Sequence, residues 1–101
     1  MQVNLEVKEG KATLVLSGRF DFNSHREFRN GCDEVMNSSQ INDVEINLAG
    51  VDYLDSSALG MLLLLRERAV ASNKKLALVQ CQGTVKQVLD VANFSQLFTI
   101  K

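Results

Sequence analysis

The chain has 101 residues, of which 46% are hydrophobic and 23% are charged, and its formal net charge is −1. This length and composition predict one globular domain that buries about two-thirds of its unfolded surface. The net charge predicts no surface for neutralising nucleic-acid phosphates, so a nucleic-acid partner is not expected.

The sequence shows no sign of export or membrane insertion. The first eight residues alternate polar and apolar side chains, which is not the pattern of a signal peptide. The longest apolar run, residues 58–65, is far shorter than the roughly 20 residues that span a bilayer. Cys32 and Cys81 are too few and too far apart for a disulfide framework or a metal site, and they predict buried free thiols. We therefore expect a cytoplasmic protein without a metal or cofactor.

The first part of the chain predicts a hairpin and then a helix. Residues 3–8 and 12–17 read as two strands joined by a short turn that contains Gly10. Residues 18–23 are expected to leave the sheet. Ser24 and Glu27 have the spacing of a capping box, and the apolar residues that follow predict a helix over about 25–37.

The alternation of side chains in the middle strand indicates how many faces of the sheet are covered by helices. Val44, Ile46 and Leu48 alternate with polar residues, whereas a strand covered on both faces reads as continuously apolar. Helices are therefore expected mostly on one face. Residues 75–81 are apolar on both sides and predict a central strand, and residues 94–100 predict a short last strand or a packed tail.

Two further helices complete the order of elements. One is predicted from near Ser56 to near Ala71, and another begins at the capping-box spacing of Thr84 and Gln87. The order is β-β-α-β-α-β-α, with a possible last strand. Because a strand–helix–strand crossover joins parallel neighbours, we expect a small single α/β domain with a mixed, mainly parallel sheet.

The most informative stretch is residues 52–65, where an acidic loop leads into the most apolar helix. Ser56 and Ser57 stand at its predicted start. A helix start offers free N–H groups and partial positive charge, which a serine can cap or a phosphate can occupy. One serine suffices for a cap, so we expect Ser56 to cap the helix and Ser57 to be spare. The residues alone favour plain capping over a phosphorylation site.

The apolar run from Met61 to Leu65 covers the whole circumference of a helix, because 3.6 residues make one turn. One side must pack on the sheet. The other sides are either covered by neighbouring helices or exposed as a docking surface beside Ser57. Both alternatives remain open from the sequence.

Three segments resemble the STAS domain, the fold of bacterial anti-sigma-factor antagonists and of sulfate-transporter tails. Residues 55–60, Asp-Ser-Ser-Ala-Leu-Gly, resemble the family signature D-S-[ST]-G-[LVI]-G; residues 18–21 resemble its early G-x-[LF]-D element, and residues 44–52 its strand and acidic lead-in. The likeness predicts one STAS domain over residues 1–101. Ala58 stands where glycine is usual, and its helix propensity is better by about 1 kcal/mol. We expect it to stiffen the helix start and to narrow access to Ser57.

The resemblance implies a non-enzymatic, bacterial regulator of transcription. In such antagonists the second hydroxyl of the signature, here Ser57, is phosphorylated by an anti-sigma factor that is also a serine kinase. The unphosphorylated form binds that anti-sigma factor and frees a sigma factor, and a PP2C-type phosphatase restores it. The family implies a monomer. The expected partner-binding residues are Asp21, Asp55, Ser56, Ser57, Ala58, Leu59, Met61 and Leu62.

Two other functions fit the sequence less well. In an accessory STAS subunit of an ABC-type lipid transporter, the same helix would dock on the ATPase without phosphorylation. An enzyme with Ser56 or Ser57 as nucleophile would need an adjacent base. The only histidine, His25, is predicted on the start of another helix.

Overall fold

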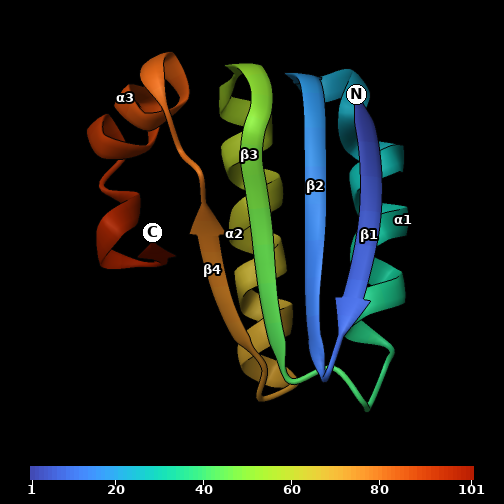
Figure 1. The fold of residues 1–101 in the computed structure, drawn as a ribbon. Coiled ribbons are helices and arrows are strands. Elements are labelled where there is room, and N and C mark those ends of the chain that lie inside the picture. The colour runs from blue at the N-terminus through green and yellow to red at the C-terminus, as the bar shows by residue number, and fades with distance from the viewer.

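The computed structural model describes residues 1–101 and contains one five-stranded sheet in the order β1-β2-β3-β4-β5 (Figure 1). β1 (Gln2–Lys8) pairs antiparallel with β2 (Lys11–Phe20). β2, β3 (Asp43–Leu54), β4 (Lys75–Val79) and β5 (Thr99–Ile100) follow as parallel neighbours. The predicted α/β class with a mixed, mainly parallel sheet is confirmed.

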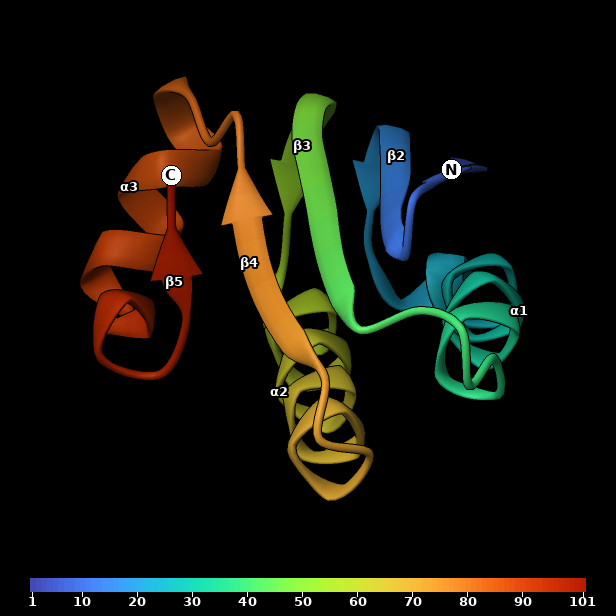
Figure 2. The ribbon, with the colours of Figure 1, turned by 60° about the horizontal axis from the view of Figure 1, so that its bottom comes forward.

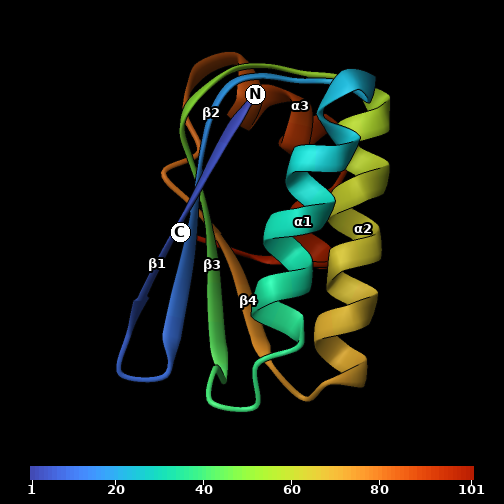
Figure 3. The same cartoon turned by 90° about the vertical axis from the view of Figure 1, so that its right-hand side faces the viewer.

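Three helices, α1 (His25–Met36), α2 (Ser56–Ala71) and α3 (Gly83–Val91), connect the parallel strands. Short 3-10 turns, η1 (Phe22–Ser24) and η2 (Phe94–Gln96), precede α1 and β5. α1 and α2 lie side by side on one face of the sheet (Figure 3), and α3 lies beside the β4 and β5 end (Figure 2). The prediction of helices mostly on one face is therefore confirmed. No helix combines the length and the apolar character that crossing a membrane requires.

The hydrophobic core lies between the sheet and these helices. Apolar side chains of the alternating strands turn toward α1 and α2, and their polar neighbours are half-exposed on the open face. The fully buried members with the largest side chains are Phe20, Leu14, Leu16, Ile46, Leu48, Leu62, Leu65, Leu78 and Leu89. Both cysteines are free thiols; Cys32 is buried as predicted, whereas Cys81 is only half-buried.

Two strands extend further than the sequence indicated. β2 continues through Phe20, although residues 18–23 were expected outside the sheet, and β3 continues through Leu54 instead of ending before an acidic loop. Gly18 has a φ of +98°, which a residue without Cβ adopts readily, and the β2–β3 register shifts beside it. The pairing then resumes and ends with Phe20 opposite Leu54. Only Asp55 therefore separates β3 from α2.

The predicted capping boxes at the starts of α1 and α3 are wrong. Ser24 makes no side-chain cap of α1, because η1 has already turned the chain and the cap falls three residues earlier, on Asp21. The Ser24 hydroxyl instead donates to the Arg19 carbonyl at 2.8 Å. α3 follows Gln82, which makes no side-chain cap, so Thr84 already lies within the helix.

Candidate functional site

The carboxyl ends of β2 and β3 meet at one edge of the sheet, and each leads through one aspartate into a helical segment (Figure 1). The backbone N–H of Asp55 donates to the carbonyl of Phe20 at 3.3 Å, directly after the last strand pair. Asp21 and Asp55 thus leave adjacent strands at the same level. This edge also holds the start of α2, with Ser56 and Ser57 in its first turn.

Asp55 is the N-cap of α2. Its backbone is extended, and its Oδ1 atom accepts a hydrogen bond from the N–H of Ala58 at 2.9 Å. This corrects the expectation that Ser56 is the cap. Aspartate caps a helix as well as serine does, and its negative charge also suits the partial positive charge of the helix start. Because β3 reaches Leu54, the residue placed to cap is Asp55.

The two serines occupy the first two helical positions after this cap. Ser56 is exposed and Ser57 is half-exposed. Neither hydroxyl makes a hydrogen bond to another protein group. The N–H of Ala58 is already bonded to the carboxylate of Asp55. The Ser57 hydroxyl is therefore free to receive a partner or a phosphoryl group at a helix end that favours negative charge.

Asp21 caps the 3-10 turn η1, which follows the adjacent strand β2. Its Oδ1 accepts from the N–H of Asn23 at 3.0 Å, and its Oδ2 lies 3.5 Å from Nε of Arg19. The Arg19 guanidinium carbon lies 4.0 Å from the centre of the Tyr53 ring, so β2 and β3 present a cation–π pair at this edge. The Asp21 carboxylate is thus engaged by its own neighbours.

The predicted partner-binding residues divide into accessible and inaccessible side chains. Ser56 is exposed, and four others are half-exposed: Asp21, Asp55, Ser57 and Leu59. Met61 retains only 8% of its surface, and Ala58 and Leu62 are completely buried. A partner cannot reach Ala58 or Leu62 in this structure, so we assign both to the core. The Ala58 methyl group points inward, and the expectation that it narrows access to Ser57 is not supported by its placement.

Burial within the apolar run of α2 differs from residue to residue. Met61, Leu62 and Leu65 are buried, Leu63 is half-buried, and Leu64 is 59% exposed. Both alternatives from the sequence thus occur in one helix: most of the run is core, and Leu64 faces solvent.

Some accessible apolar side chains near this edge were not singled out from the sequence. Phe22 in η1 is 74% exposed and Tyr53 at the end of β3 is 39% exposed. Phe20 and Phe22 are separated by one residue, and the sequence pattern does not show which of the two enters the core. The exposure of Phe22 follows from the turn of η1, a tertiary feature.

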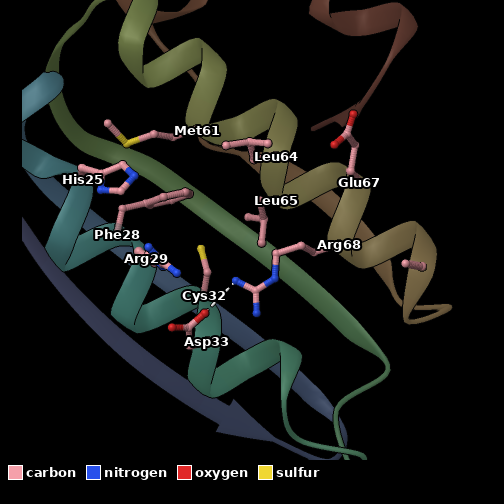
Figure 4. A pocket seen from close by; sticks show the side chains of 11 residues that line it. His25, Phe28, Arg29, Cys32, Asp33, Met61, Leu64, Leu65, Glu67 and Arg68 are labelled. Atoms are coloured by element: carbon pink, nitrogen blue, oxygen red, sulfur yellow. Dashed lines mark hydrogen bonds and ion pairs between the residues drawn. The ribbon is translucent and has the colours of Figure 1, made fainter.

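A groove of about 530 Å³ separates α1 from α2 (Figure 4). Its floor is formed by buried side chains of both helices: Phe28, Cys32, Met61 and Leu65. Burial raises the pKa of the Cys32 thiol to about 12. Nη1 of Arg68 donates to Oδ1 of Asp33 at 2.7 Å and so bridges the two helices.

The site does not have the arrangement of a serine enzyme or a metal centre. His25 lines the groove and forms no hydrogen bond to Ser56 or Ser57. A serine nucleophile requires a base within hydrogen-bond reach. No three histidine, cysteine or acidic side chains come together in a group that could hold a metal ion. The arrangement offers a free hydroxyl at a capped helix start, surrounded by accessible apolar and charged side chains.

Comparison with known proteins agrees with this fold over nearly the whole chain. The family model described as STAS domain matches residues 2–101. A STAS-domain containing protein of Pseudomonas aeruginosa (strain UCBPP-PA14) is 42% identical over 88 residues, which cover 87% of this chain and 85% of the relative.

Solved structures of anti-sigma factor antagonists share the architecture. One from Mycobacterium paratuberculosis has a TM-score of 0.87 at 17% identity, covering 98% of this chain and 83% of its own. SpoIIAA in its unphosphorylated form has a TM-score of 0.75 at 18% identity, covering 98% and 86%. Its phosphorylated form gives 0.74 at 17% identity, covering 98% and 90%. At these identities the structures establish the fold.

Proposed function

The chain belongs to the STAS domain family, and from that premise we propose that it is an anti-sigma-factor antagonist. In its unphosphorylated form it binds an anti-sigma factor that is also a serine kinase, and this binding releases a sigma factor. Phosphorylation of Ser57 switches the binding off, and a PP2C-type phosphatase restores it. The protein acts in the cytoplasm as a binding module and not as an enzyme.

The observation that carries this proposal is the state of the Ser57 hydroxyl. It lies in the first turn of α2, it is accessible, and it makes no hydrogen bond that a kinase would have to break. Asp55 already satisfies the cap, so Ser57 has no capping role to lose on modification. The anti-sigma factor antagonist SpoIIAA, which shares this fold, exists in unphosphorylated and phosphorylated forms.

The effect of phosphorylation follows from charge. A phosphoryl group adds about −1.5 to −2 charges near neutral pH, on a molecule whose net charge is −1. The start of α2 offsets part of this charge, and the carboxylate of Asp55 opposes it. Because the Ser57 hydroxyl makes no hydrogen bond within the protein, we expect the domain to keep its structure. The phosphate acts by placing an unpaired charge in the interface, which costs several kcal/mol.

The accessible side chains around Ser57 define the proposed contact surface. Ser56 and Leu59 lie on α2, and Asp21, Asp55 and the exposed ring of Phe22 lie at the adjoining strand ends. Exposed aromatic side chains are frequent anchors of protein interfaces. We therefore add Phe22 to the residues of this chain that are proposed to contact the anti-sigma factor.

The test is phosphorylation by the cognate kinase with ATP, read by mass spectrometry. We expect one phosphate on the wild-type protein, none on Ser57→Ala, and an unchanged phosphate on the control Ser56→Ala. The phosphorylated protein should bind the kinase at least about 100-fold more weakly than the unphosphorylated protein. Phosphate on another residue, or none from a kinase that binds the protein, would overturn the proposal. Co-purification with a transporter ATPase would favour the accessory-subunit function instead.

A further inference from the structure

We propose that the groove between α1 and α2 receives an amphipathic helix of the same anti-sigma factor, one that carries apolar anchors and an acidic side chain. This inference rests on the proposed function and extends the contact from Ser57 along α2. In this arrangement the groove supplies much of the affinity, and the Ser57 hydroxyl supplies the switch.

The groove continues the surface that contains Ser57. Positions separated by three, four or seven residues share one face of a helix, and Ser57 is followed at this spacing by Met61 and Leu64. Both of these residues line the groove. Gly60, between them and Ser57, is exposed, and a Cβ atom added there would meet nothing within 4 Å. A partner that covers Ser57 can therefore approach the α2 backbone closely and reach the groove within one helical turn.

The shape and lining of the groove suit apolar side chains of a helix. Phe28 and Leu65 form part of a buried floor, and Leu64 stands 59% exposed on the α2 wall (Figure 4). Helix-in-groove recognition places successive apolar anchors of one helix face into such a depression. Burial of Leu64 by an occupant would remove the apolar surface that this part of α2 leaves in water.

The charges on the walls specify the polar side of the occupant. Arg29 on α1 lines the groove and takes part in no salt bridge, whereas Arg68 is held by Asp33 at 2.7 Å. Glu67 on α2 also takes part in no salt bridge, and it points away from Arg29 (Figure 4), so it does not neutralise that cation. The free cation is thus on the α1 wall, where an acidic side chain of the occupant would pair with it. Such rim charges act mainly on the association rate and its salt dependence.

The experiment measures binding of the purified cognate kinase, without ATP, by titration calorimetry. Leu64→Asp should weaken binding at least about 30-fold, the effect of removing an interface hot spot. The matched control is Val70→Asp, because Val70 lies on the same helix with 67% exposure, outside the groove. It should change affinity by less than about twofold. Stopped-flow mixing at several salt concentrations measures the association rate, which Arg29→Ala should lower and make less dependent on salt. Both replaced apolar residues are exposed, so thermal unfolding should show that both Asp variants are folded.

Each outcome separates the groove from the switch. If phosphorylation of Ser57 abolishes binding and Leu64→Asp binds like Val70→Asp, the groove proposal is overturned and the proposed function stands. If Leu64→Asp weakens binding and phosphorylation does not, the groove is supported and the switch fails. A dimer or a bound amphiphile that Leu64→Asp releases, with unchanged kinase affinity, assigns the groove to another occupant and overturns the proposal. If the wild-type protein binds no kinase, both the groove proposal and the proposed function are overturned.

Discussion

Two adjacent strands end in an aspartate that caps a helical segment, yet the two helix starts use their serines in opposite ways. After β2, Asp21 caps η1, and the hydroxyl of Ser24 donates to the Arg19 carbonyl and accepts from the N–H of Asp21 at 3.1 Å. After β3, Asp55 caps α2, and the hydroxyl of Ser57 makes no hydrogen bond to a protein group.

The difference shows which serine belongs to the fold and which is available to a partner. Ser24 is 1% exposed and its hydroxyl is fully used, so the first start is closed. Ser57 is accessible and its hydroxyl is unused, so the second start is open. Because Asp55 supplies the cap, modification of Ser57 would break no hydrogen bond of the fold. The same chemistry at the first start would break the turn that leads into α1.

The largest effect on stability is expected from a substitution of Ser24, the serine whose hydroxyl is used by the fold. Ser24→Ala should lower the free energy of unfolding by about 2 kcal/mol, because the Arg19 carbonyl and the Asp21 N–H lose their partner. Urea unfolding measures the change. The matched control, Ser57→Ala, should remain within about 0.5 kcal/mol of the wild-type protein. Equal losses in the two variants would contradict the distinction between the closed and the open start.

A smaller effect is expected at the open start itself. Asp55→Ala should cost about 1 kcal/mol, because the N–H of Ala58 loses its acceptor. Asp55→Asn keeps a side-chain acceptor and should cost only a few tenths of a kcal/mol. Thermal unfolding of both variants tests the cap. An equal loss in Asp55→Asn would show that the negative charge, and not the hydrogen bond, stabilises the start of α2.

The smallest effect is expected in the reactivity of Cys32, which lies on α1 beyond the closed start. Its raised pKa of about 12 keeps the thiol protonated at pH 8, and the thiolate is the reactive form. Because the Cys32 side chain is also only 3% exposed, alkylation should require transient opening of α1. In a Cys81→Ser background, Ser24→Ala should accelerate alkylation several-fold and Ser57→Ala should not. A rate unaffected by Ser24→Ala would show that α1 opens independently of its start.

Local pattern in the sequence predicted the helices and the position of Ser57 well. The expected ranges 25–37 and 56–71 agree with α1 and α2, because helical periodicity acts within a few residues. In the structure Asn73, just after α2, has a left-handed conformation that ends the helix. The motif at residues 55–60 pointed to the family that the comparison identifies.

Only the tertiary structure decided which neighbouring side chain takes which role. Asp55 and Ser56 are both good caps, and the choice depends on where β3 ends, which its pairing with β2 sets at Leu54 opposite Phe20. In the same way, Leu64 and Leu65 are identical in the sequence, and packing of α2 against α1 and the sheet buries one and exposes the other. Caps and burial depend on contacts between distant segments, which a local pattern does not contain.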